Sequence, residues 1–211
     1  MSRAFPDKLP GGARPYVLPF AALMAILAAG PYLPVPESFR YPLRTLAVLA
    51  VLLAVSRGVV KLRPSQWLGS VAVGLAVFAI WVGPDLLAPH YREHWLLQNS
   101  VAGRVPSGEP AGAHNALWLA FRISGSVLLV PVVEELFWRA WMLRVLPFWA
   151  TALLFASEHG PYWDVGLAAG IAYNWWMLRT RSLADCILAH AVTNASLAAY
   201  VLASNRWQYW L

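Results

Sequence analysis

The sequence predicts an all-α, polytopic membrane protein, and three observations carry this prediction. Of the 211 residues, 59% are apolar and only 12% are charged, whereas a soluble domain has roughly 25% charged residues. The twelve Trp and eight Tyr residues belong to the types that gather at bilayer interfaces. The apolar residues also form stretches close to the roughly 20 residues that a helix needs to cross a bilayer. An ordinary soluble domain, a coiled coil and a disordered chain are therefore excluded.

Seven apolar segments follow one another along the chain, and we expect each to be a helix, some of them short or broken around a polar cavity. They span residues 16–33, 44–55, 67–87, about 116–146, 147–157, 165–178 and 183–203. The first segment is too long for the apolar part of a signal peptide, so we expect an uncleaved helix. In the sixth segment, Gly166 and Gly170 form a G-x-x-x-G pattern that permits close helix packing.

The chain is expected to form one integral membrane domain in two parts. Residues 1–115 contain the N-terminal membrane helices and a polar loop, and residues 116–211 form the helical core that carries the polar candidates. The long polar stretch from Gly83 to Asn115 is expected to lie on the non-cytoplasmic face as a loop or an interfacial helix.

Basic residues between the segments predict the orientation in the membrane. One set of connections holds ten of them, namely Arg3, Lys8, Arg14, Arg57, Lys61, Arg63, Arg139, Arg144, Arg179 and Arg181. The opposite set holds five, namely Arg40, Arg44, Arg92, Arg104 and Arg206. The positive-inside rule then predicts a multi-pass protein of the cell (inner) membrane with a cytoplasmic N-terminus.

Charge and cysteine content exclude further classes of protein. The net charge of +6 is spread over short connections without a basic cluster, so no nucleic-acid partner is expected. The single cysteine, Cys186, cannot form an internal disulfide or a cysteine-rich zinc site, so any metal would rest on His and carboxylate ligands.

Polar residues in the apolar segments after residue 115 are the candidates for chemistry, because an ionisable residue within a span costs about 2.5–3.5 kcal/mol on insertion scales. Glu135 and Arg139 stand at positions i and i+4, so they share a helix face and can pair, whereas Glu134 projects about 100° away. His190 and Asn194 have the same four-residue spacing and present an imidazole and an amide to one space.

A depth argument indicates that these groups meet. If the chain reverses near Pro147, Glu134 lies 13 residues before the turn and His159 lies 12 after it. Both are then about 20 Å from the turn at a helical rise of about 1.5 Å per residue. His190 follows the turn at Arg181 by nine residues, which puts it about 13 Å from that turn by the same rise, so all three residues can converge within the bilayer.

A carboxylate with two imidazoles in a semi-enclosed cavity suits hydrolysis in two ways. In one, Glu134 takes a proton from water, a histidine orients that water, and a His–Asn pair donates hydrogen bonds to an oxyanion. In the other, Glu134, His159 and His190 bind a divalent metal such as zinc. The residues themselves leave both alternatives open.

Three motifs resemble the signature of the CPBP family of intramembrane proteases, which includes the CAAX-processing endopeptidases and the bacterial Abi proteins. These are Glu134-Glu135-x-x-x-Arg139, Phe155-x-x-x-His159 and His190-x-x-x-Asn194. The resemblance covers residues 116–203. It implies an intramembrane endopeptidase in which Glu134 and His159 activate water and His190 and Asn194 stabilise the oxyanion. It also implies that Glu135 and Arg139 support the site.

The resemblance extends to partners. The stretch from Pro131 to Arg139 is similar to bacterial CAAX-protease-related proteins that accompany exosortase systems. A membrane-associated protein or peptide is therefore the expected substrate within the lipid bilayer, and an exosortase-type sorting system is an expected partner. Prenylated substrates are not expected in that branch.

Other hypotheses remain beside this one. A catalytically inactive scaffold or assembly factor would use the same polar residues for helix packing and partner binding. A transporter is less favoured because two matching halves with broken helices are missing. The pattern His90-x-x-Glu93-His94 matches an inverted zinc-protease motif but lies in a polar loop. Cys186, one turn before His190, is expected to be a small buried residue rather than a nucleophile.

Overall fold

The computed structural model describes residues 9–88 and 90–210, and of Glu37 only the backbone. Within this part of the chain every named element is helical, so the predicted all-α fold class is confirmed. The basic residues Arg3 and Lys8, which entered the prediction of orientation, lie outside the described residues.

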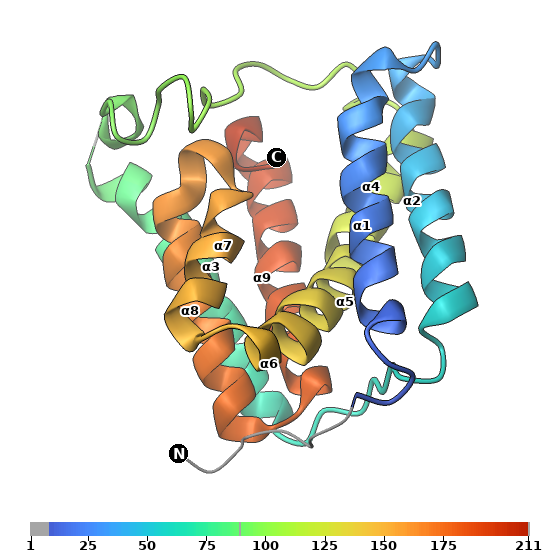
Figure 1. The fold of residues 1–211 in the computed structure, drawn as a ribbon. Helices are drawn as coiled ribbons and strands as arrows, with labels where there is room; N and C mark the ends of the chain where they lie inside the picture. The colour runs from blue at the N-terminus through green and yellow to red at the C-terminus, as the bar shows by residue number, and fades with distance from the viewer. Residues whose placement is uncertain (1–8, 89, 211) are drawn as a thin grey trace.

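Figure 1 shows the order of the helices. They are α1 (Arg14–Ala29), α2 (Glu37–Val55), α3 (Trp67–Leu87), α4 (Ala116–Ser124), α5 (Val130–Glu135), α6 (Leu143–Val145), α7 (Phe148–Ser157), α8 (Trp163–Thr180) and α9 (Leu183–Ser204). Two π-helical segments, η3 (Gly125–Leu129) and η4 (Leu136–Met142), join α4, α5 and α6 into one helix from Ala116 to Val145. We call this 30-residue element the long helix. Short 3₁₀ turns are η1 (Gly30–Tyr32), η2 (Tyr91–Glu93), η5 (Gly160–Tyr162) and η6 (Trp207–Tyr209).

Among the described residues, five helices are long and apolar enough to cross a membrane, so the protein is a multi-pass membrane protein. They are Arg14–Tyr32, Ser38–Val55, Trp67–Leu87, Ala116–Val145 and Leu183–Ser204. The other two predicted segments are also helices, but neither is among the candidate membrane spans. Helix α7 is apolar but has only 10 residues. Helix α8 has 18 residues but is not among the candidate spans, and it carries Asp164, Asn174 and Arg179.

The predicted boundary of the second segment is wrong. Helix α2 begins at Glu37 rather than Arg44 and includes Pro42. A proline so close to the helix start removes only one backbone hydrogen bond near an end whose first N–H groups lack intrahelical partners. The first turns of α2 therefore extend the apolar segment with Arg40 and Arg44.

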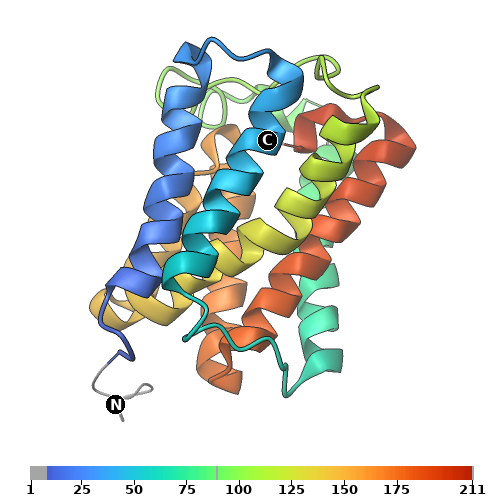
Figure 2. The same ribbon diagram turned by 90° about the vertical axis from the view of Figure 1, so that its right-hand side faces the viewer.

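The helices form two groups on either side of the long helix (Figures 1 and 2). The antiparallel pair α1 and α2 packs against one side, through α4 and η4. On the other side α9 contacts η3 and α5, and α3, α8 and α9 pack against one another, with α7 on α8. The chain reverses direction at Leu146 and Pro147, which have extended backbone between α6 and α7, as the depth argument requires.

One buried carboxylate fixes the start of α9 against the start of α3. Asp185 is fully buried, and its two oxygens accept hydrogen bonds from Ser65 N and Oγ, Gln66 N and Ser70 Oγ at 2.7–3.0 Å. Since Ser65 and Gln66 immediately precede α3, Asp185 also satisfies backbone N–H groups at the start of that helix.

The polar loop after α3 is anchored by Arg92. Its guanidinium donates to Asp85 at the end of α3, to Asp164 in the first turn of α8 and to the Pro161 carbonyl. Its guanidinium carbon also lies 4.3 Å from the ring centroid of Tyr162. The loop therefore closes one end of the helix bundle over the ends of α3 and α8 (Figure 1).

Of the described basic residues assigned to the cytoplasmic face, all but one lie at the other end of the bundle. Because the helices alternate in direction, Arg14, the α2–α3 connection, Arg144 and the α8–α9 connection share that end. Arg139 does not count toward the orientation, because its side chain is fully buried inside the bundle. The predicted cytoplasmic end therefore exceeds the loop end in basic residues by one fewer than the sequence count indicated.

We predict that Asp185→Asn lowers the free energy of unfolding by about 2 kcal/mol, because an amide N–H₂ replaces one acceptor oxygen and faces the buried donors of Ser65 or Gln66. Unfolding in mixed micelles, followed by circular dichroism, measures this loss. Ser204→Ala at the exposed end of the same helix is the control and should change stability by less than about 0.5 kcal/mol. Equal stability of the Asp185 variant and the control would contradict the anchoring role.

Candidate functional site

The four predicted catalytic residues line one cavity of about 290 Å³ between the two groups of helices. Glu134 comes from α5, His159 from the end of α7, and His190 and Asn194 from α9. Leu23 and other residues of α1 and α2 close the opposite wall. Segments far apart in the sequence therefore meet here, and we call this space the site cavity.

The two adjacent glutamates face different surroundings. Glu134 lines the site cavity, and its Oε2 atom is buried with no hydrogen-bond partner among the described residues. Glu135 is fully buried outside the cavity lining. The helix that carries them is π-helical directly before α5 and directly after it. Such wide turns are frequent at functional sites. The predicted separation of the two carboxylates is thus confirmed.

Glu135 connects the long helix to α9. Its Oε1 atom accepts from Arg139 Nη1 at 3.1 Å, which confirms the predicted pair, and lies 2.8 Å from His190 Nδ1. Arg139 is fully buried, and its guanidinium carbon lies 4.3 Å from the Phe155 ring centroid and 5.2 Å from that of Tyr173. Because Glu135 Oε1 accepts from Arg139, it also acts as the acceptor toward His190, whose Nδ1 then carries the hydrogen. The imidazole of His190 is thereby held in one orientation, stacked on Tyr173.

The hydrogen bonds of His159 define its tautomer when neutral. Its Nδ1 lies 2.8 Å from the Phe155 carbonyl oxygen. Because a carbonyl oxygen can only accept, Nδ1 must carry the hydrogen, and Nε2 keeps its lone pair in the neutral ring. The ring packs edge-on against Trp81 at a centroid distance of 5.3 Å. Helix α7 ends just before it, and Gly160, with a φ of +54°, makes the turn into η5.

The G-x-x-x-G pattern of α8 makes room for His159. A Cβ atom on Gly166 would lie 3.1–3.2 Å from the Cβ, Cγ and Nδ1 atoms of His159, and one on Gly170 would lie 3.1 Å from the Ala152 carbonyl oxygen. The expected close packing is confirmed for α7 and α8. In addition, because Gly166 has no side chain, there is space beside α8 for the imidazole of His159.

Asn194 contacts the long helix at its first π-helical segment. Its Nδ2 donates to the Ser126 carbonyl oxygen at 2.8 Å. That bond uses one of the two amide hydrogens, so a second N–H and the Oδ1 atom remain for other partners. The neighbouring Thr193 accepts from Tyr173 Oη at 2.7 Å and donates to backbone carbonyls, including that of Gly74 at 2.9 Å. These bonds hold α9 against α3, α8 and the long helix around the cavity.

Sequence reasoning did not select Glu158, which also lines the site cavity. Its Oε1 atom accepts from Trp138 Nε1 at 2.9 Å, which ties the end of α7 to η4. The available signal was a carboxylate at the end of an apolar segment, next to His159. Tyr41, Arg44, Trp81 and Tyr173 also line the cavity and were not selected, since aromatic residues of apolar helices are usually core residues.

The residues do not fit a metal site. Among the described residues no group of three or more His, Cys, Asp or Glu side chains is placed to hold a metal ion. The set Glu134, His159 and His190 lines one cavity but does not form such a group.

Two other expectations concern residues outside the cavity lining. The His90-x-x-Glu93-His94 segment contains a single 3₁₀ turn rather than a long helix, and His90 Nδ1 pairs with Glu93 on the exposed surface at 2.9 Å. The zinc-protease helix is therefore absent from this segment. Cys186 is fully buried, and its Sγ contacts the Tyr173 carbonyl oxygen at 3.8 Å. Arg122 donates to the Trp210 carbonyl oxygen at 2.7 Å.

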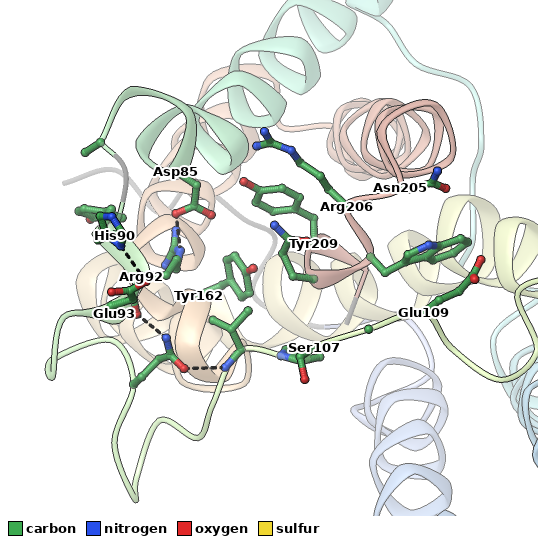
Figure 3. A pocket seen from close by; sticks show the side chains of 18 of the residues that line it. Asp85, His90, Arg92, Glu93, Ser107, Glu109, Tyr162, Asn205, Arg206 and Tyr209 are labelled. Atoms are coloured by element: carbon green, nitrogen blue, oxygen red, sulfur yellow. Dashed lines mark hydrogen bonds and ion pairs between the residues drawn. The ribbon is translucent and has the colours of Figure 1, made fainter.

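A larger pocket of about 860 Å³ lies on the loop end of the bundle and is not the site cavity (Figure 3). Its lining comes from the polar loop, the ends of α3 and α9, and η5 and η6, and includes none of the predicted catalytic residues. Tyr209 lines both spaces. Burial raises the pKa of Tyr209 to about 12, so this boundary residue is neutral near pH 7.

Comparison with known proteins identifies the part of the chain that carries the site. Residues 116–196 match the family model described as type II CAAX prenyl endopeptidase Rce1-like. This segment is therefore similar to the CAAX protease family. The matched segment includes all six of the predicted site residues, from Glu134 to Asn194.

A second similarity is to a transport protein. The Na⁺/H⁺ antiporter NhaA of Acidovorax sp. (strain JS42) is 33% identical over 102 residues, which cover 42% of this chain and 24% of the antiporter. The chain thus spans about a quarter of that relative. No solved structure matches the chain.

The contacts of the two glutamates predict that substitution of Glu135 destabilises the protein much more than substitution of Glu134. Glu135→Gln should lower the free energy of unfolding by about 3 kcal/mol, because the variant leaves Arg139 and His190 buried without their carboxylate. Glu134→Gln should change stability by less than about 1 kcal/mol, because Glu134 accepts no hydrogen bond from described residues. Unfolding in mixed micelles compares the pair, each variant being the control for the other. Equal losses would show that the two carboxylates have equivalent surroundings.

Proposed function

We propose that this protein is a CAAX-type intramembrane endopeptidase that hydrolyses a peptide bond of a membrane-associated protein. The observation that carries the proposal is the shared cavity of Glu134 and His159. The Oε2 atom of Glu134 has no hydrogen-bond partner among the described residues. The Nδ1 atom of His159 contacts the Phe155 carbonyl oxygen, so its Nε2 atom is available. The match of residues 116–196 to the CAAX family supports the same activity.

The contacts suggest a sequence of steps with water as nucleophile. Glu134 acts as general base and takes a proton from water while His159 Nε2 accepts the second hydrogen of that water and orients it. The resulting hydroxide attacks the carbonyl carbon and forms a tetrahedral oxyanion. Glu134 then returns the proton to the leaving amine, the C–N bond breaks, and a carboxyl group and an amine are formed.

The oxyanion would be stabilised from α9. The second amide hydrogen of Asn194 and an Nε2–H of His190 are the donors available there. Because His190 Nδ1 is directed to Glu135, this role requires hydrogens on both ring nitrogens, with the Glu135 carboxylate beside the ring. Glu135 and Arg139 are positioning residues in this proposal, since they act through the orientation of His190 and the packing of the long helix.

Localisation and partner are part of the proposal. We place the protein in the cell membrane with a cytoplasmic N-terminus, supported by the basic residues at the end of the bundle opposite the polar loop. An exosortase-type sorting system is the proposed partner, supported by the resemblance of the Pro131–Arg139 stretch. A membrane-associated protein without a prenyl group is the proposed substrate.

A second candidate function is exchange of cations against protons, which the similarity to the Na⁺/H⁺ antiporter favours. Glu134 and Glu158 would then carry protons at the cavity. Sodium-dependent pH changes in vesicles that contain the purified protein test this function. Exchange that Glu134→Gln abolishes, together with unchanged protein processing, would replace the protease proposal.

We predict that Glu134→Gln and His159→Ala each reduce proteolysis by about 10²–10⁴-fold, the usual contribution of a general acid–base group. Uncleaved precursors should accumulate in cells that contain either variant at wild-type abundance, and mass spectrometry of the membrane fraction detects them. Glu93→Gln on the exposed loop is the control and should leave processing unchanged. If both site variants process every protein normally while deletion of the whole protein causes a defect, the scaffold hypothesis takes the place of catalysis.

We also predict that Gly166→Ala lowers activity at least about tenfold with the fold retained, because the new Cβ displaces His159 and small misplacements of catalytic groups are costly. The control is Gly83→Ala in α3, where an added Cβ meets nothing within 4 Å. Cleavage rates of the two purified variants, compared at equal helix content, measure the effect. Equal rates would show that the position of His159 does not limit the reaction.

A further inference from the structure

A second cavity, rich in arginine, adjoins the site cavity. It measures about 320 Å³ and lies between the α1–α2 pair, α4 and the C-terminal residues. Its polar and aromatic lining consists of Arg40, Arg44, Arg122, Tyr41, Trp118 and Trp210, and none of the described residues that line it is acidic. We call it the arginine pocket. The charged side chains among its described lining residues are therefore all arginines.

The arrangement of two guanidinium groups around one ring concentrates this charge. The guanidinium carbon of Arg44 lies 3.9 Å from the ring centroid of Tyr41, and that of Arg122 lies 4.7 Å from the same centroid. No described carboxylate lies within 4 Å of Arg44. Like charges held this close repel one another in surroundings of low dielectric constant. A bound anion would relieve that repulsion.

The position of the pocket in the bundle points to a membrane lipid. Arg40 and Arg44 stand in the first two turns of α2, next to η1 at the end of the first span. This depth corresponds to the headgroup region, where Trp and Tyr also gather. Leu27 and Leu43 line the same pocket and are 42% and 47% exposed on spans that face the bilayer. The arginine pocket therefore has a charged side and, next to it, an apolar side.

We propose that the arginine pocket binds the phosphate group of an anionic phospholipid, with the acyl chains along Leu27 and Leu43. Guanidinium groups bind phosphate oxygens through paired hydrogen bonds, and basic pockets between membrane helices bind lipid headgroups. Arg40 contributes although its Nε donates to the Val35 carbonyl oxygen at 2.9 Å and its Nη2 to the Leu33 carbonyl oxygen at 3.5 Å, because a guanidinium has five N–H donors and these bonds use two of them.

Bound lipid would also contact the proteolytic site, because the two cavities share lining residues. Leu27, Tyr41, Arg44 and Trp210 line both. The lipid would thus neutralise Arg44 at the edge of the site cavity and fill the space between α2 and α4. The lipid site itself does not depend on the proposed protease activity.

The test is native mass spectrometry of the full chain in detergent micelles, titrated with phosphatidylglycerol or with zwitterionic phosphatidylcholine. We expect preferential binding of phosphatidylglycerol, with affinity at least about tenfold lower for Arg44→Gln and for Arg40→Gln. Arg104→Gln on the loop and Arg179→Gln at the other end of the bundle, both exposed, are the controls with the same change of charge. They should retain wild-type affinity.

Three results would overturn the proposal. They are equal binding of the two lipids by the wild type, equal losses in the control and pocket variants, and displacement of phosphatidylglycerol by inorganic phosphate, which would indicate a site for the free ion. Circular dichroism identifies a variant that fails to fold, and the two pocket variants are independent of each other. Since lipid binding is measured without a cleavage assay, loss of the protease proposal would leave this result standing.

Discussion

The carboxylate of Glu135 is the interaction on which the rest of the site depends. It accepts from Arg139 within its own helix and contacts His190 on α9, in surroundings from which water is excluded. Burying such charges costs free energy, and the cost is offset only when the partners are held in good geometry. The long helix and α9 therefore have one favourable register at this level. That register brings Glu134, His190 and Asn194 to the same cavity.

The separation of two adjacent glutamates follows from this constraint. Once Glu135 is turned inward to its two partners, Glu134 must project to another face of the same helix. The π-helical segments on either side of α5 shift that face relative to a regular helix and bring the Ser126 carbonyl oxygen to Asn194. A single helix thus supplies a structural carboxylate and a reactive one in consecutive positions.

Polar contacts between helices hold the remaining bundle together. In a bilayer the hydrophobic effect does not drive helices against one another, so close packing and hydrogen bonds do so. Asp185 joins α9 to the start of α3, Tyr173 and Thr193 join α8 to α9 and α3, and Trp176 Nε1 donates to Ser70 Oγ at 3.1 Å. Glycines permit this approach, since a Cβ on Gly74 would lie 2.4 Å from the Ala189 carbonyl oxygen. The walls of the site cavity are therefore rigid where its chemistry is placed.

The sequence by itself determined the helical class, the order of the apolar segments, the reversal at Pro147 and the pairing of Glu135 with Arg139. Each of these depends on spacing along one segment, which composition and helical periodicity report directly. Only the tertiary structure decided that His190 contacts Glu135, that Glu158 and Arg44 line the site cavity, and that Arg139 is buried rather than at the membrane surface. These features depend on which helix faces meet. Helix faces are chosen by packing and hydrogen bonding between residues far apart in the chain, and no local pattern records that choice.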